Sequence, residues 1–230
     1  MTGLIQKKQQ TALYLAILFH TIGLLGILFV NKDFFTQLTP LNLLVSFALV
    51  LWTQEEKNTA FWFFALICFV TGIVTEYLGV NYQLLFGSYQ YLSPLGVKWE
   101  GVPLMIGVNW FVIMYCCGIS VQIVLNAIWN RLKDDDMPVR NNVGFWAIVL
   151  DGALLATFFD WVMEPVAIKL GFWQWLGDGS IPFKNYWSWF LVSAFLLLLF
   201  RLFRFQKQNI FGVHLLLVQL MFFLILRTFL

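Results

Sequence analysis

The sequence has little charge. Of its 230 residues only 11% are Asp, Glu, Lys or Arg, whereas 60% are hydrophobic, and the mean hydropathy is +0.79. A water-soluble domain carries about 25% charged residues, so this chain has too few polar side chains to cover a surface that faces water. The net charge is only +2 and no basic patch is present, which argues against a nucleic-acid partner. The composition therefore predicts a protein embedded in a bilayer.

Motifs that bind metals, phosphates or nucleotides are also missing. The sequence has no HExxH motif, no glycine-rich phosphate loop and no GxSxG elbow. Cys68, Cys116 and Cys117 lie inside apolar segments without disulfide or CxxC spacing, which predicts buried hydrophobic residues. The run Lys133-Asp134-Asp135-Asp136 stands alone and predicts a solvated linker. We therefore expect neither a metal ion nor an organic cofactor.

What the chain does have is a series of long apolar segments. A spanning helix needs about 20 mostly apolar residues. Seven segments fit or approach this length: 11–30, 38–53, 59–78, 103–129, 143–163, 186–205 and 209–229. The sequence thus predicts an all-α integral membrane protein with about seven transmembrane helices. The last segment has no lysine to form a Schiff base, which excludes a retinal protein.

Positive charge is distributed unevenly between the two ends of these helices. If the N-terminus is cytoplasmic, nine Lys and Arg residues flank the cytoplasmic ends and five flank the opposite ends. An excess of positive charge marks the cytoplasmic side. We therefore predict a bacterial cytoplasmic membrane protein with a cytoplasmic N-terminus, whose long loops 79–102 and 165–185 lie on the opposite face.

One internal repeat organises the chain. Residues 75–91 (TEYLGVNYQLLFGSYQY) align without a gap with residues 159–175 (FDWVMEPVAIKLGFWQW). The alignment pairs Glu76 with Asp160, and a Tyr-Gln-Tyr end with a Trp-Gln-Trp end. Both copies close helices that run in the same direction, so we predict a parallel helix-loop-helix repeat. We therefore predict a single transmembrane domain over residues 1–230. Its two repeat units cover about 59–129 and about 143–205.

Ionisable side chains inside a membrane are costly and are candidates for function. Glu76 and Asp160 are duplicated, and Glu164 follows Asp160 by one helical turn on the same face. The alternative is that these acids reach water at the level of the lipid headgroups, but their duplicated aromatic context favours a site. Asp151 lies deeper and out of phase with Asp160, and its role stays open. We expect a neighbouring hydroxyl or amide to satisfy His20.

Buried carboxyls among aromatic rings suit proton transfer to an apolar molecule. Aromatic residues make up 19% of the chain, enough to form a wall for a long apolar ligand. In a pocket of low dielectric constant, one carboxyl can stay protonated while its neighbour stays ionised. The protonated group can convert an alkene to a carbocation, which Tyr and Trp faces stabilise by about 0.5–2 kcal/mol each. Attack by water then gives net hydration of a double bond.

Several motifs in this part of the chain are together typical of one family. They are Glu76-Tyr-Leu-Gly, Phe86-Gly-Ser-Tyr-Gln-Tyr, Leu95-Gly, Gly101-Val-Pro-Leu, Trp110, Asp160…Glu164-Pro165, Gly171-Phe-Trp-Gln-Trp and Pro182…Asn185. Over roughly residues 60–205 the chain resembles the carotenoid 1,2-hydratase family, also called carotenoid biosynthesis proteins or bisanhydrobacterioruberin hydratase-like proteins. The family motif has Asp-Pro where this chain has Glu164-Pro165, so only the acidic role carries over to Glu164.

The resemblance implies a hydratase that adds water across the C1–C2 double bond of an acyclic carotenoid end. Lycopene or γ-carotene would give a 1-hydroxy carotenoid. We predict Glu76, Asp160 and Glu164 as the catalytic residues. The predicted substrate-binding residues are aromatic and amide side chains in and after the two motifs: Tyr77, Tyr89, Tyr91, Asn109, Trp110, Trp161, Trp173, Trp175 and Asn185.

Two other functions are compatible with the sequence. A non-enzymatic carotenoid or lipid carrier would leave the polyene unchanged, and a small transporter with the acids as a proton relay would show pH-driven flux. The expected partners are the carotenoid, water and the bilayer. The sequence leaves open which carboxyl is the acid, whether both substrate ends react, and whether the chain forms a homo-oligomer.

Overall fold

The computed structural model describes residues 2–132 and 137–230. The run 133–136, predicted to be a solvated linker, lies outside the described residues. The helices of the described ranges are α1 (Thr2–Phe29), α2 (Lys32–Gln37), α3 (Thr39–Thr53), α4 (Thr59–Tyr82), α5 (Leu104–Leu132), α6 (Met137–Lys169), α7 (Phe183–Leu202) and α8 (Ile210–Phe229). The short strands are β1 (Tyr89–Tyr91), β2 (Lys98–Trp99), β3 (Val102–Pro103) and β4 (Trp173–Trp175), and a 3₁₀ turn covers Ser93–Leu95.

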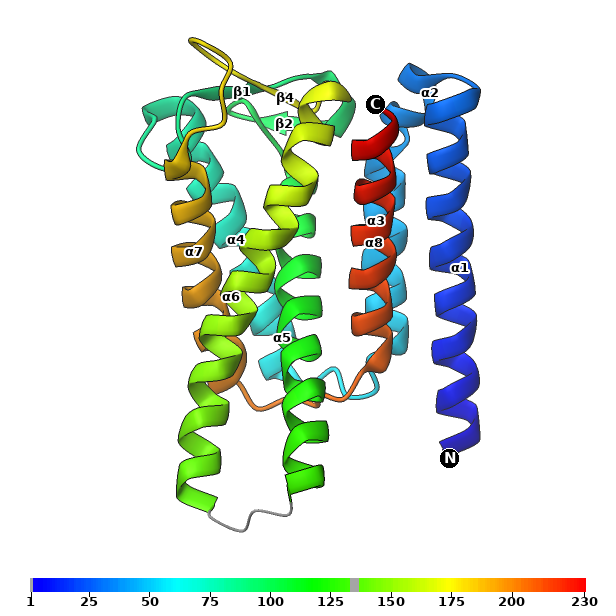
Figure 1. The fold of residues 1–230 in the computed structure, drawn as a ribbon, viewed down its shortest axis with the longest axis vertical. Coiled ribbons are helices and arrows are strands. Elements are labelled where there is room, and N and C mark those ends of the chain that lie inside the picture. The colour runs from blue at the N-terminus through cyan, green and yellow to red at the C-terminus, as the bar shows by residue number, and fades with distance from the viewer. Residues whose placement is uncertain (1, 133–136) are drawn as a thin grey trace.

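The helices confirm the prediction of an all-α membrane protein. Within the described ranges, six of them (α1, α4, α5, α6, α7 and α8) are long and apolar enough to cross a membrane. The predicted second span is α3, whose 15 residues extend about 22 Å, less than the roughly 30 Å of hydrocarbon in a bilayer. Helix α3 still runs along the bundle beside α8. The chain therefore passes along the bundle an odd number of times, and its N- and C-termini lie at opposite ends (Figure 1).

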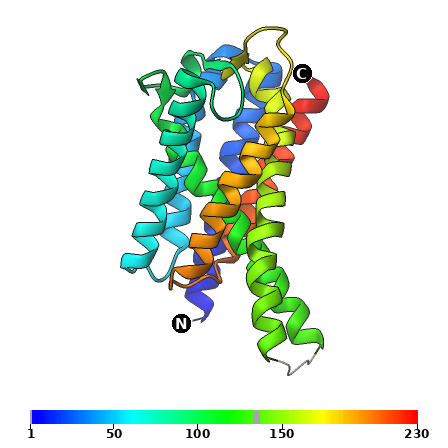
Figure 2. The ribbon, with the colours of Figure 1, turned by 90° about the vertical axis from the view of Figure 1, so that its left-hand side faces the viewer.

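Helix α5 is the centre of the bundle. Every residue from 110 to 120 is buried, and the helix contacts α3, α4, α6, α7 and α8. A helix that is apolar on all sides is stable where other helices or lipid surround it, and here it is other helices. At the end opposite the strands, α5 and α6 extend beyond the other helices (Figure 2).

A buried polar network ties α3, α5 and α8 together near the N-terminal end of the bundle. Tyr115 Oη donates to Gln54 Oε1 at 2.5 Å. The amide nitrogen of Asn209 donates to Thr53 Oγ1 at 2.9 Å and to Tyr115 Oη at 3.0 Å. Asn209 also caps α8 by accepting from the backbone N–H of Phe211. Because these groups satisfy one another, we assign the network a structural role.

The two tripeptides that the repeat aligned pair with each other. Strands β1 and β4 are antiparallel, with the register Tyr89↔Trp175, Gln90↔Gln174 and Tyr91↔Trp173. Side chains alternate along a strand, so both glutamines are exposed and the four aromatic rings are buried. Before each strand a glycine has positive φ, Gly87 at +142° and Gly171 at +70°. We call this strand pair the roof; it lies over the ends of α4 and α6 (Figure 1).

Candidate active site

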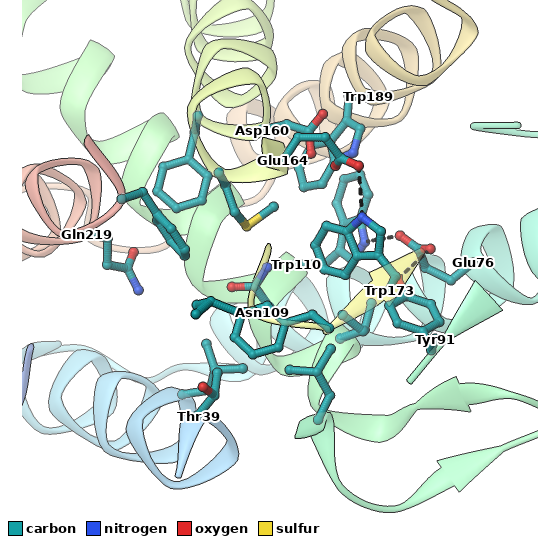
Figure 3. Close-up of a pocket in the computed structure, with 18 of the residues that line it drawn as sticks. Thr39, Glu76, Tyr91, Asn109, Trp110, Asp160, Glu164, Trp173, Trp189 and Gln219 are labelled. Atoms are coloured by element: carbon teal, nitrogen blue, oxygen red, sulfur yellow. Dashed lines mark hydrogen bonds between the residues drawn. The ribbon is translucent and has the colours of Figure 1, made fainter. Parts of the chain in front are cut away.

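The three predicted acids line one cavity between the roof and the helices (Figure 3). Its empty space is about 970 Å³, counting the part that is open to the surroundings. Glu76 of α4 is 5% exposed, and Asp160 and Glu164 of α6 are 0% and 2% exposed. This burial contradicts the alternative that the acids simply reach water at the headgroup level.

Glu76 is held by hydrogen-bond donors from two elements. From β1, Tyr89 Oη donates to Glu76 Oε2 at 2.5 Å and Tyr91 Oη donates to the same oxygen at 2.7 Å. From α5, Trp110 Nε1 donates to Oε1 at 3.3 Å. Three donated hydrogen bonds favour the ionised form of a carboxyl, whereas its burial opposes that form. These contacts therefore favour a carboxylate at Glu76 more than burial alone would allow.

The two tyrosines are themselves fixed as donors. Burial raises the pKa of Tyr89 and of Tyr91 well above the usual value of 10, and the nearby charge of Glu76 raises it further. Both hydroxyls therefore keep their protons at neutral pH. A protonated phenol can donate to Glu76, whereas a phenolate would repel it.

Glu164 is held from the other half of the roof. Trp173 Nε1 and Trp175 Nε1 both donate to Glu164 Oε1, at 2.8 Å and 2.6 Å. An indole N–H can only donate, so this pair of tryptophans also favours a carboxylate. Neither ring donates to Glu164 Oε2.

Asp160 has the fewest donors of the three acids. The amide nitrogen of Asn185, on α7, donates to Asp160 Oδ2 at 2.7 Å. In the described part of the chain, the buried Oδ1 has no hydrogen-bond partner. Asp160 lies one helical turn before Glu164, so both carboxyls are on the same face of α6. This environment suits a carboxyl that carries its own proton.

The contacts correct one detail of the sequence alignment. The gapless alignment pairs Glu76 with Asp160, but the acid bound by the second half of the roof is Glu164. The reason is that α6 continues about one turn further towards its strand than α4 does. A residue one turn later therefore reaches the same height below the roof.

Aromatic rings surround the acids. Beneath the roof, Trp110 of α5 stacks on Trp189 of α7, with ring centroids 4.3 Å apart and an interplanar angle of 16°. Within the roof, the rings of Tyr89 and Trp175 lie 5.2 Å apart. The cavity thus offers π faces close to buried carboxyls, although Trp189 was not among the predicted binding residues.

Most of the predicted binding residues line the cavity: Tyr89, Tyr91, Asn109, Trp110, Trp173, Trp175 and Asn185. Tyr77 and Trp161 do not. Tyr77 and Trp161 each directly follow an acid in a helix. Successive side chains of a helix point about 100° apart around its axis, so these two rings point away from the cavity that the acids face. Tyr77 instead stacks on Trp99, with ring centroids 5.4 Å apart.

Trp161 has a structural contact on the outside of α6. Pro165 has no N–H to donate to the carbonyl of Trp161, four residues earlier in the helix. Arg227 of α8 replaces that donor, with its Nη1 3.0 Å from the carbonyl oxygen and its guanidinium 4.2 Å from the centroid of the Trp161 ring. Trp161 therefore links α6 to α8 and does not line the cavity.

The cavity has polar lining residues that the repeat did not reveal: His20 of α1, Asn42 of α3 and Gln219 of α8. As expected, an amide satisfies His20, since Asn42 Nδ2 lies 3.4 Å from its Nε2. Gln219 could have been found as a polar residue inside an apolar span. Asp151 is exposed on α6 and does not line the cavity. Among the described residues, no three His, Cys, Asp or Glu side chains are arranged to hold a metal ion.

The chain matches a known protein family. The family model described as carotenoid biosynthesis protein matches residues 38–230. This range contains both copies of the repeat, the three acids and the roof, but it begins after α1. No curated protein and no solved structure matches the chain.

Proposed function

Because the chain belongs to the carotenoid biosynthesis protein family, we propose that it is a hydratase that acts on a carotenoid inside the membrane. The proposed reaction adds water across the C1–C2 double bond of an acyclic end group, as in lycopene or γ-carotene, and gives a tertiary 1-hydroxy carotenoid. The observation that carries this proposal is that Glu76, Asp160 and Glu164 are buried in one aromatic cavity.

Asp160 is the proton donor in this scheme. It has one donating partner and an oxygen without a partner in the described ranges, whereas Glu76 and Glu164 are each bound by two or more donors. The proton of Asp160 forms a bond to C2 of the alkene, and the electron pair of the double bond becomes that C–H bond. A tertiary carbocation remains at C1.

Glu76 completes the addition. A water oxygen forms a bond to C1, and Glu76 takes the proton that the water loses. To close the cycle, Glu76 releases the proton it gained to water and Asp160, with Glu164 beside it, takes one proton up from water, so that the three carboxyls end as they began. The ionised carboxylates and the π faces of Trp110 and Trp189 stabilise the cation, and each ring contributes about 0.5–2 kcal/mol.

Expression in a host that accumulates an acyclic carotene tests this function. Wild type should convert the carotene to a product that is heavier by one water and more polar, which chromatography and mass spectrometry detect. Asp160→Asn and Glu76→Gln should each lower conversion by at least about 100-fold, because a general acid or base contributes about 10²–10⁴-fold.

The matched control is Asp151→Asn. Asp151 lies on the same helix as Asp160 but is exposed and outside the cavity, so this variant should retain conversion. Full conversion by both cavity variants would contradict the assigned roles. Unchanged carotene that co-purifies with wild type would instead indicate a carrier.

A further inference from the structure

A second polar cluster lines the same cavity, away from the acids. Its members are His20 and Asn42, whose side-chain nitrogens lie 3.4 Å apart, and Gln219, which lines the same cavity; we call these three residues the amide cluster. Figure 3 shows Gln219 across the cavity from Glu76. The amide cluster lies outside the repeat and transfers no proton in the proposed reaction. Proton transfer therefore does not account for these polar side chains.

Gln219 is a polar side chain in an apolar, buried position. It is 4% exposed and lies in α8, which is long and apolar enough to cross a membrane. No donor of the described residues lies within hydrogen-bonding distance of its Oε1. An unsatisfied polar group in hydrocarbon costs several kcal/mol. A leucine would avoid that cost, so the amide indicates that a polar group binds here.

His20 orients the second amide of the cluster. His20 Nδ1 lies 2.8 Å from the carbonyl oxygen of Ala16, which can only accept, so Nδ1 carries the hydrogen. His20 Nε2 is then an acceptor, and the amide nitrogen of Asn42 faces it at 3.4 Å. Asn42 Oδ1 is left over, and no partner for it lies in the described part of the chain. Asn42 and Gln219 thus both line the cavity, and each has a buried acceptor oxygen without a partner among the described residues.

We propose that the amide cluster is a hydroxyl-binding subsite, which takes the O–H group of water or of a tertiary alcohol on the polyene. Two acceptor oxygens require a donor, which an O–H group provides and a hydrocarbon or a ketone does not. The amide nitrogen of Gln219 can in turn donate to the hydroxyl oxygen. This inference rests on the proposed function, because it assumes that the polyene occupies this cavity.

The test uses purified wild type, Gln219→Leu and Asn42→Leu in detergent micelles, with Gln122→Leu as the matched control. Gln122 lies on α5, donates to Asn126 and does not line this cavity. Tryptophan fluorescence quenching measures the affinity for a 1-hydroxy acyclic carotenoid and for its parent hydrocarbon. Wild type and the control should bind the alcohol about tenfold more tightly, as expected for one hydrogen bond of about 1.4 kcal/mol. Both cluster variants should lose this preference.

A second readout distinguishes the two sources of the hydroxyl. If the cluster holds the reactant water, wild type shows no binding preference, and the cluster variants lower kcat for hydration about tenfold at unchanged KM. Unchanged preference and unchanged kcat in both variants overturn the subsite. A wild type that forms no hydroxy product contradicts the proposed function instead; the subsite then stands only if the binding preference is present and is lost in the variants.

Discussion

At the scale of single residues, the three acids differ in what donates to them. Glu76 is bound by two tyrosines and a tryptophan, Glu164 by two tryptophans, and Asp160 by one asparagine. Hydrogen bonds to a carboxylate favour its charged form. The differences in donor number are therefore a physical basis for one protonated carboxyl and two carboxylates among chemically similar groups.

The tyrosines of the roof predict a pH dependence of stability. Burial holds the pKa of Tyr91 well above 10 in the folded protein, whereas an unfolded tyrosine titrates near 10. Above pH 10 the folded state therefore binds more protons than the unfolded state, and stability falls as pH rises. Between neutral pH and pH 11 this effect lowers the free energy of unfolding by about 1.4 kcal/mol, and Tyr91→Phe should abolish that decrease.

Thermal unfolding in detergent between pH 9 and pH 11 measures this effect. Tyr14→Phe is the control, because Tyr14 is 68% exposed on α1 and should leave the pH dependence as it is. Parallel pH profiles for wild type and Tyr91→Phe would contradict the burial of a protonated phenol beside Glu76.

At the scale of elements, close packing of α4 on α5 positions Trp110. A Cβ added at Gly72 would lie 2.5 Å from Cδ1 of Trp110, too close for any side chain. Trp110 is buried and stacked on Trp189, so its ring has little room to yield. The glycine is thus what allows the indole to reach Glu76.

Gly72→Ala should therefore destabilise the protein and lower its activity. Overpacking costs about 1–3 kcal/mol, which exceeds or offsets the gain of about 1 kcal/mol in helix propensity. Gly23→Ala is the matched control, since a Cβ at this position would meet only Phe222, at 3.7 Å. This substitution should stabilise α1. Thermal unfolding and product yield measure both variants. Equal behaviour of the two would show that the contact with Trp110 is unimportant.

Local patterns in the sequence predict much of this molecule. Apolar segment length predicts the helices, and the cost of charge in a membrane points to Glu76, Asp160 and Glu164. Pairing of β1 with β4 could not be read from either copy alone, because it depends on residues more than 80 positions apart. The directions of Tyr77 and Trp161 depend on how α4 and α6 are rotated in the bundle. The amide cluster depends on the packing of α1, α3 and α8, which share no motif.

At the scale of the whole molecule, the bundle places the roof and the N-terminus at opposite ends (Figure 1). The excess of Lys and Arg at the N-terminal end predicts that this end is cytoplasmic, in a bacterial cytoplasmic membrane. A reporter that is active only outside the cytoplasm should then work when fused after Leu230 and fail when fused before Met1. The reverse pattern would contradict the orientation, and equal activity at both ends would contradict an odd number of passes.

The central claim is that buried carboxyls pass a proton to a hydrocarbon and that water captures the cation. Isotope labelling of the product of purified wild type tests this claim directly. In D₂O enriched in ¹⁸O, the account predicts one deuterium at C2 and one ¹⁸O at C1 of the 1-hydroxy carotenoid, as seen by mass spectrometry and NMR. A product whose oxygen does not come from water, or whose C2 carries no deuterium, would contradict it.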